Sequence, residues 1–121
     1  CRPGGLVVVD AWHLPGLVLD PPVARTQELR LEEGTILRRT STPEVHWSTS
    51  TTAVKYALRW SGRGQPRDVE EVHHMRAYTT FELSLLAHST GLDVLEVVPS
   101  PGLQGVLSDQ DWHIGMVARR N

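Results

Sequence analysis

The sequence predicts an α+β fold in which strands outnumber helices, and three patterns support this prediction. Residues 6–10 read Leu-Val-Val-Val-Asp, a composition typical of a strand buried on both faces. Residues 54–60 alternate apolar and polar side chains with the period of two that marks a strand. Residues 79–91 carry the start and stop signals of one main helix. With 121 residues, the chain is long enough for one domain with a core, so we expect residues 1–121 to form a single domain.

The composition excludes several classes of function. A net charge of -2 gives no basic surface for phosphates, so we expect no nucleic-acid partner. No apolar run approaches the roughly 20 residues that span a bilayer, so we expect no membrane partner. The six histidines and the single cysteine lack metal-ligand spacing, so we expect no metal. A single cysteine fits a reducing compartment, and we expect a cytoplasmic protein.

The given sequence begins within a predicted turn-and-strand motif. Gly4-Gly5 provide a turn directly before the strand at 6–10, and no initiator Met precedes them. We therefore expect the chain to be part of a longer protein. We also expect the strand at 6–10 to have an open edge, covered by a second copy of the chain, a swapped segment or the rest of the protein.

The middle of the chain, residues 22–78, is predicted to form an antiparallel sheet. The returning strand is expected at residues 69–78, after a loop at 61–66. Breaks or turns are expected where glycine and proline interrupt the pattern, at Pro15-Gly16, Pro21-Pro22, Gly34 and Thr42-Pro43.

The last third of the chain is predicted to contain the helix and two strands. Thr79 and Glu82 have the spacing of a capping box, and Gly91 is placed to end the helix in a left-handed conformation. Strands are expected at residues 92–98 and 112–118, joined by a Pro/Gly/Ser loop. In the last strand, Trp112, Ile114, Met116 and Ala118 alternate against more polar or smaller residues.

Three motifs in this order resemble the C-terminal half of class I S-adenosylmethionine-dependent methyltransferases. They are Pro3-Gly4-Gly5 before the first strand, the capped helix and following strand from Tyr78 to Leu92, and the closing hairpin that ends in residues 115–120. The resemblance implies the C-terminal part of a Rossmann-like sheet, with S-adenosylmethionine as cofactor of the whole protein. No residues here resemble the family's glycine-rich cofactor loop, so no cofactor-binding residue is assigned. We expect this chain alone not to catalyse the reaction.

The strand-rich insertion at 22–78 resembles the auxiliary antiparallel sheet of N-methyltransferases that act on nucleotide-linked amino sugars. The similar strings are Asp10-Ala11-Trp12, Val54-Lys55-Tyr56, Glu70-Glu71-Val72-His73 and Tyr78-Thr79. The resemblance implies that this sheet covers a small natural-product acceptor, such as an amino sugar of antibiotic biosynthesis, and helps to form a homodimer.

Candidate substrate-binding residues come from several segments. Asp10, Trp12 and His13 follow the carboxyl end of a predicted parallel strand, where ligands of open α/β sheets bind. The alternative is a loop with a packed tryptophan and a solvated histidine. Tyr56, Arg76 and, in the Pro/Gly loop, Gln104 are weaker candidates, and Tyr56 is alternatively a core residue.

His73 is the candidate for a base or for a residue that orients one. His73 and His74 occupy adjacent strand positions, so they face opposite sides. The resemblance favours His73 as the residue facing the pocket, with Glu71 two positions earlier on the same face. A carboxylate beside an imidazole raises its basicity and orients it. The alternative is an exposed polar strand face.

A second interpretation is a non-catalytic β-rich module that binds a small apolar ligand or dimerises. Trp47, Tyr56 and Trp60 would then line its ligand cup. The two interpretations differ in the strand at 6–10. It lies beside the final strand in the methyltransferase fold, and it belongs to a closed antiparallel barrel in the binding module.

Overall fold

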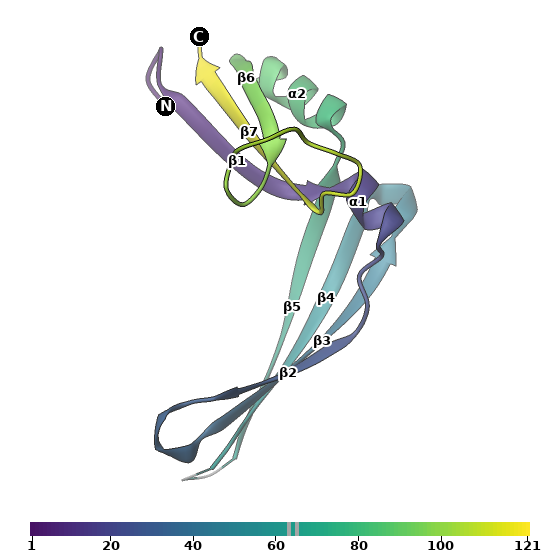
Figure 1. Ribbon diagram of the computed structural model, residues 1–121, viewed down its shortest axis with the longest axis vertical. Coiled ribbons are helices and arrows are strands. Elements are labelled where there is room, and N and C mark those ends of the chain that lie inside the picture. Colours follow the sequence, from purple (N-terminus) through teal and green to yellow (C-terminus); the bar gives the residue numbers. More distant parts are fainter. Residues whose placement is uncertain (63, 65) are drawn as a thin grey trace. The chain divides into compact units, whose positions relative to one another are not determined.

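The chain forms two compact units, and each is described on its own. The computed structural model describes residues 1–62, 64 and 66–121. The first unit comprises Cys1–Pro21 and Arg76–Asn121, and the second comprises Pro22–Met75. The second unit nearly coincides with the span 22–78 in which the auxiliary sheet is expected. Figure 1 labels the helices and strands of both units.

The first unit contains a mixed sheet whose strands follow the order β5-β1-β7-β6. Strand β1 pairs antiparallel with β7 from Leu6↔Arg119 to Trp12↔His113, and parallel with β5 at Trp12↔Ala77 and His13↔Tyr78. The elements are β1 (Leu6–His13), α1 (Leu14–Leu19), α2 (Thr80–Ser89), β6 (Leu92–Pro99) and β7 (His113–Arg120), together with the last residues of β5, a strand that spans Arg67–Tyr78. Because β1 lies beside the final strand in a mixed sheet, the structure favours the methyltransferase interpretation over a closed antiparallel barrel.

Strand β1 has an open edge and an open face. Over residues 6–11, the described strands pair with β1 on the β7 side alone, as the sequence predicts. Leu6 and Val8 are 60% and 57% exposed, whereas Val9 and Ala11 pack against the core. The prediction that this run is buried on both faces is therefore wrong for this chain. The reason is that the described helices cover the face of Val9 and Ala11 and leave the face of Leu6 and Val8 to solvent.

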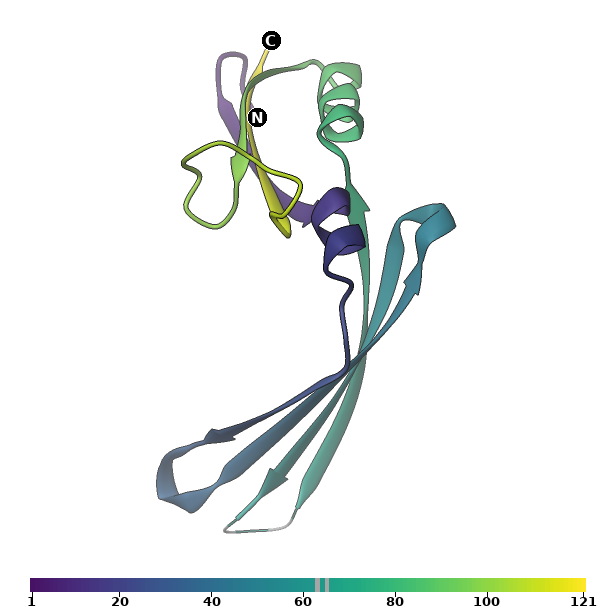
Figure 2. The same ribbon diagram turned by 45° about the vertical axis from the view of Figure 1, so that its right-hand side comes forward.

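The core of the first unit lies between α2 and β7. Figure 2 shows α2 beside the strands of this unit. The fully buried cluster consists of Leu83 and Ala87 from α2 and of Ile114, Met116 and Ala118 from β7. The alternation predicted for the last strand is thus confirmed. No helix in the described parts of the chain is long and apolar enough to cross a membrane.

Helix α1 replaces the break expected at Pro15-Gly16. Pro15 occupies the first turn, where a helix needs no N–H donor and the fixed φ of proline fits. Gly16 is buried, and a Cβ atom there would overlap the backbone carbonyl of Asp111. The two residues therefore start a helix and let it approach a neighbouring backbone closely.

The second unit is a sheet with the order β2-β3-β4-β5. Its elements are β2 (Arg25–Arg30), a 3-10 turn (Glu32–Gly34), β3 (Ile36–His46), a 3-10 turn (Trp47–Thr49), β4 (Thr51–Ser61) and the first part of β5. The predicted turn at Gly34 is confirmed, with φ of +77°. The alternation predicted for residues 54–60 is also confirmed, because Val54 is buried and Lys55 is exposed. Residues 63 and 65 of the predicted loop lie outside the described residues.

The turn predicted at Thr42-Pro43 is wrong, because both residues lie inside β3. Pro43 is opposite Val54 of β4, while the pairing of β3 with β2 runs from Ile36 to Ser41. Past Ser41, the β2 side of β3 is an edge among the described strands. A proline is tolerated there because its missing N–H leaves no ladder hydrogen bond unmade.

The capping box and the helix end are confirmed. The Thr79 side chain accepts a hydrogen bond from the Glu82 backbone N–H at 3.2 Å, and the Thr79 backbone N–H donates to Glu82 Oε2 at 2.9 Å. Gly91 follows the helix with φ of +73°, in the left-handed region. Both ends of α2 are therefore encoded locally.

Replacing the cap residue is expected to destabilise the protein. Thr79→Ala removes the side-chain acceptor for the Glu82 N–H and should lower the free energy of unfolding by about 1 kcal/mol. Urea titration followed by circular dichroism measures this. Thr80→Ala, one exposed residue into the helix, is the matched control and should change stability much less. Equal losses in the two variants would contradict the role of Thr79.

The contribution of the capping box to the free energy of unfolding is expected to depend on pH, because Glu82 is charged. The backbone N–H of Thr79, followed by its hydroxyl and Arg76, holds the pKa of Glu82 below its ordinary value of 4.5. A lowered folded-state pKa stabilises the fold above about pH 4.5, and this stabilisation is lost as the pH falls through the folded-state pKa. The stability gap between the protein and Glu82→Gln should therefore be full at pH 7 and close on acidification. A gap that stays constant from pH 7 to pH 3 would contradict this.

Candidate functional site

The structure places His13 in the interior of the first unit. Its side chain is 3% exposed, and its Nδ1–H donates to the backbone carbonyl of Asp111 at 2.9 Å. The Asp111 carboxylate accepts hydrogen bonds from the backbone N–H and hydroxyl of Ser108, and the backbone bond is the main reason why the pKa of Asp111 is lowered. His13 therefore fastens the end of β1 to the segment before β7.

Asp10 and Trp12 lie in the last part of β1 rather than in a loop after it. Asp10 is exposed, and one of its carboxylate oxygens lies 3.9 Å from Nδ1 of His113. The rings of Trp12 and Trp112 lie 5.9 Å apart at a tilt of 57°. The sequence predicts Trp112 as the first residue of the last strand, whereas β7 begins at His113. The contact of Trp112 with Trp12 depends on the β1–β7 register, which the sequence does not indicate.

Arg76 and Gln104 lie in separate parts of the first unit. Arg76 forms a 3.8 Å ion pair with Glu82, and its guanidinium lies 5.0 Å above the ring of Tyr78. It is thereby tied to the beginning of α2. Gln104 is an exposed residue of the loop between β6 and β7.

The second unit brings together three predicted site residues, Tyr56, Glu71 and His73. His73 Nε2 lies 3.2 Å from Glu71 Oε2, so the ring N–H donates to the carboxylate. The ring of His73 meets the ring of Tyr56 nearly edge-on, with 4.9 Å between the centroids. These three residues line a hollow of about 280 Å³ together with Arg39 and Leu58, and we call it the His73 hollow.

Arg39 is the residue of this hollow that the sequence did not reveal. Its guanidinium carbon lies 4.5 Å above the ring of Tyr56, a cation–π contact. The two residues meet because β3 and β4 pair with Arg39 opposite Leu58. Nothing in the local sequence indicates that register, so the signal was not available from the residues alone.

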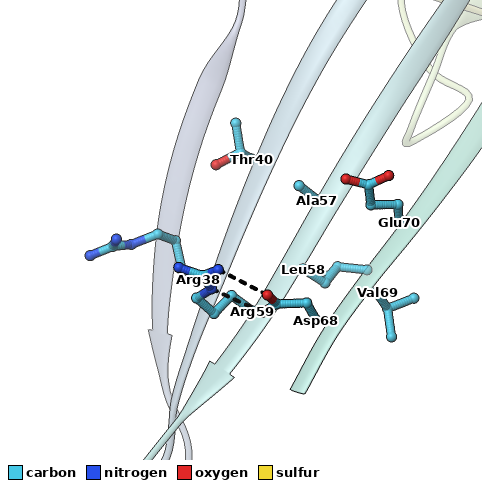
Figure 3. Close-up of a pocket in the computed structure, with 8 residues that line it drawn as sticks. All are labelled: Arg38, Thr40, Ala57, Leu58, Arg59, Asp68, Val69 and Glu70. Atoms are coloured by element: carbon cyan, nitrogen blue, oxygen red, sulfur yellow. Dashed lines mark hydrogen bonds and ion pairs between the residues drawn. The ribbon is translucent and has the colours of Figure 1, made fainter. Parts of the chain in front are cut away.

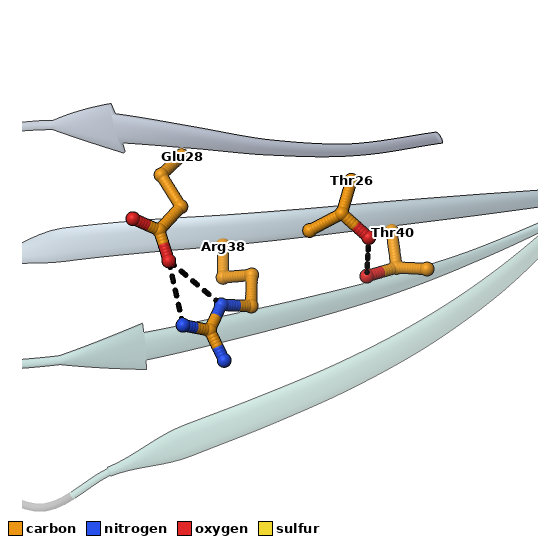
Figure 4. Close-up of polar contacts among 4 residues, drawn as sticks. All are labelled: Thr26, Glu28, Arg38 and Thr40. Carbon is orange, nitrogen blue, oxygen red and sulfur yellow. Dashed lines mark hydrogen bonds and ion pairs between the residues drawn. The ribbon is translucent and has the colours of Figure 1, made fainter. Parts of the chain in front are cut away.

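The opposite side of the same sheet, which we call the polar face, pairs two of its arginines with carboxylates. Arg59 forms two hydrogen bonds to Asp68, at 2.9 and 2.8 Å, beside a hollow of about 220 Å³ (Figure 3). The hydrogen bond from Arg59 lowers the pKa of Asp68. Arg38 donates to Glu28, and the hydroxyls of Thr26 and Thr40 lie 3.1 Å apart (Figure 4). These contacts pair Arg38 and Arg59 with carboxylates, while Lys55 and Glu70 line a further hollow of about 410 Å³ on the same face.

No metal centre is assigned. Among the described side chains, which leave out those of residues 33, 63 and 65, no group of three or more histidine, cysteine, aspartate or glutamate residues is arranged to hold a metal ion.

Comparisons with known proteins give the fold. No protein-family model matches the chain, and no curated protein matches it significantly. Solved structures do match it. An S-adenosylmethionine-dependent methyltransferase from Clostridium acetobutylicum has a TM-score of 0.72 at 13% identity, over 98% of this chain and 46% of that chain.

Two further matches are sugar methyltransferases. CalS10 of Micromonospora echinaspora, an amino pentose methyltransferase of calicheamicin biosynthesis solved with S-adenosylmethionine bound, has a TM-score of 0.66 at 20% identity over 99% of this chain and 45% of that chain. The sugar N-methyltransferase KedS8 of Streptoalloteichus has a TM-score of 0.67 at 17% identity over 97% and 43%. The chain thus has the fold of part of an S-adenosylmethionine-dependent methyltransferase, and it spans a little under half the length of these structures.

Among the described residues, none forms a site that fits S-adenosylmethionine. The Rossmann arrangement holds a nucleotide cofactor on a glycine-rich turn between a strand and a helix, and this sequence has no such turn. Among the described side chains, the one buried polar atom without a hydrogen-bond partner is Nε1 of Trp112, an uncharged donor that does not identify a cofactor. We therefore assign no residue of this chain to the cofactor.

The close approach of α1 to Asp111 predicts a sensitive position. Gly16→Ala would place a methyl group against the Asp111 carbonyl that also accepts the His13 hydrogen bond, so unfolding free energy should fall by about 1–3 kcal/mol. Val18→Ala, an exposed change in the same helix, is the control and should have a small effect. Thermal unfolding measures both. A Gly16→Ala variant as stable as the parent would contradict the close approach.

Proposed function

We propose that this chain is the acceptor-covering portion of an S-adenosylmethionine-dependent methyltransferase that acts on a small natural product, with the amine of a nucleotide-linked amino sugar as the favoured acceptor. One observation carries the reaction class: 97–99% of the chain matches solved structures that include methyltransferases of sugars. The same likeness supports S-adenosylmethionine as the cofactor of the whole protein and a role in antibiotic biosynthesis.

The chemistry of the His73 hollow fits the acceptor side of such a reaction. S-adenosylmethionine supplies an activated methyl group, and the acceptor amine must present a lone pair to attack it. Because the Nε2–H of His73 donates to Glu71, the lone pair of a neutral imidazole lies on Nδ1. Nδ1 is then the atom that takes a proton from the amine. The ring of Tyr56 gives the sugar an apolar surface beside it.

In the first unit, taken by itself, four exposed or half-buried residues are kept as proposed substrate contacts. Asp10 is exposed and Trp12 is half-buried, so both offer surface at the carboxyl end of β1. Arg76 and Gln104 are exposed and are further proposed contacts, while the buried His13 holds the end of β1 in place. The open edge of β1 is covered by another part of the whole protein. We further propose a cytoplasmic homodimer.

Methyl transfer to an amino sugar is the test. The whole protein is incubated with methyl-labelled S-adenosylmethionine and a panel of nucleotide-linked amino sugars, and mass spectrometry locates the label. We expect label on the sugar nitrogen. Incorporation into none of the amines, or into a hydroxyl instead, would contradict the proposed acceptor.

The role of His73 is tested with its neighbour as control. His73→Asn removes the base and should lower kcat at least about 100-fold. His74→Asn changes the adjacent exposed histidine on the other face of β5 and should leave kcat within about twofold. Equal effects of the two substitutions would contradict a chemical role for His73.

A further inference from the structure

We propose that His113 and Asp10 hold one hydroxyl group of the acceptor between them, so that the first unit distinguishes hydroxylated acceptors from deoxygenated ones. The inference deepens the proposed function, and it rests on that proposal for the acceptor being a sugar. It depends on four residues of the first unit, which we call the His113 cluster: Asp10, Trp12, Leu103 and His113.

Strand pairing places the His113 cluster at one end of the sheet. Strands β1 and β7 run antiparallel, with Trp12 opposite His113 and Asp10 opposite Gly115. The amino end of β7 therefore lies at the carboxyl end of β1, where ligands of open α/β sheets bind. Cross-strand partners and alternate residues share a face, so Asp10, Trp12 and His113 lie on the same face of the sheet.

Leu103 fills the fourth position of this arrangement. Gly115 has no side chain, and a Cβ atom there would overlap the side chain of Leu103, which comes from the loop between β6 and β7. Leu103 has φ of +51°, a conformation that is disfavoured for leucine and persists where packing holds it. Leu103 and Trp12 thus form one diagonal of the cluster, and the two polar residues form the other.

The separation of the polar pair suits a bridging hydroxyl. Asp10 Oδ1 and His113 Nδ1 lie 3.9 Å apart, which is too far for a hydrogen bond between them. An oxygen atom placed about 2.8 Å from both can accept from an imidazole N–H and donate to the carboxylate. A water molecule can occupy such a gap, and a ligand hydroxyl replaces it with the same hydrogen bonds. The side chains of Asp10 and His113 are 61% and 38% exposed, so the gap is accessible from solvent.

The apolar pair suits the rest of a sugar ring. Trp12 is half-buried and Leu103 is 37% exposed, so both offer apolar surface beside the polar pair. A pyranose ring carries C–H groups on its faces and hydroxyl groups around its edge. A ring whose C–H groups rest on Trp12 or Leu103 therefore presents a hydroxyl to the polar pair.

Binding of a neutral sugar to the whole protein, without S-adenosylmethionine, tests the inference. Methyl glucoside is the hydroxylated probe. Methoxytetrahydropyran is the reference, because it has the same ring and methoxy group without a hydroxyl. Nuclear magnetic resonance follows the indole N–H signal of Trp12 and the ring signals of His113 during each titration. We expect the glucoside to shift both sets of signals and to bind at least about tenfold more tightly than the reference.

Two substitutions remove the two hydrogen bonds separately. His113→Phe keeps a ring without its nitrogen atoms, and Asp10→Ala removes the carboxylate. Each should weaken the binding of methyl glucoside at least about tenfold. His88→Phe changes an exposed histidine in α2 and is the matched control, which should leave binding within about twofold. Thermal unfolding confirms that each variant is folded.

Four results would overturn the inference. They are no binding of methyl glucoside by the parent protein, equal affinity for the glucoside and the reference, unchanged glucoside binding in either His113→Phe or Asp10→Ala, and an equal loss in His88→Phe.

The failure of this inference is distinguishable from the failure of the proposed function. Glucoside binding that depends on His113, without methyl transfer to any amino sugar, leaves the subsite standing and rejects the reaction. Methyl transfer with unchanged KM and kcat in His113→Phe keeps the reaction and rejects the subsite. If both are correct, His113→Phe should raise KM for the amino sugar at least about tenfold and change kcat little, because the hydroxyl contact is made equally in the ground state and the transition state.

Discussion

The alternation of side chains along β3, β4 and β5 decides which residues lie together on each face of the second unit. Because neighbouring residues point to opposite sides, a single step along the chain separates Arg38 from Arg39 and His73 from His74. One side collects arginine–carboxylate pairs that satisfy one another. The other side collects an arginine on a tyrosine ring and a histidine on a carboxylate. The chemistry of the His73 hollow depends on this register, since a slip of one residue would exchange the two sets.

In the first unit, the arrangement depends on a close approach between two backbone segments. Gly16 lets α1 lie against Asp111, and the same Asp111 carbonyl accepts the hydrogen bond of His13. The end of β1 is thus joined to the segment that leads into β7, and Trp12 and Trp112 are brought together beside this junction. A small residue and a buried histidine, which look unrelated in the sequence, therefore serve one structural purpose.

Features encoded within a few residues were predictable from the sequence, and features that depend on pairing between distant segments were not. The capping box of Thr79 and Glu82 and the left-handed Gly91 are local, and both are confirmed. The proximity of Glu71 and His73 also follows from strand periodicity alone. In contrast, the sequence predicts a turn or break at Pro43 and at Pro15-Gly16, because proline and glycine are also the residues that form real turns. Only the edge position of Pro43 and the packing of Gly16 on Asp111 distinguish them. Arg39 was missed because its neighbour Tyr56 lies 17 positions away along the chain.

The ion pairs of the polar face contribute little to the stability of the sheet. Exposed ion pairs such as Arg38–Glu28 and Arg59–Asp68 contribute roughly 0–1 kcal/mol each, so pairing Arg39 in the same way would have stabilised the sheet little. Leaving it unpaired therefore costs the fold little. The cation–π contact of Arg39 with the Tyr56 ring is of similar worth at an exposed position, about 0.5–1 kcal/mol. Arg39 therefore gives up little stability by lying over the ring of Tyr56 instead of pairing with a carboxylate.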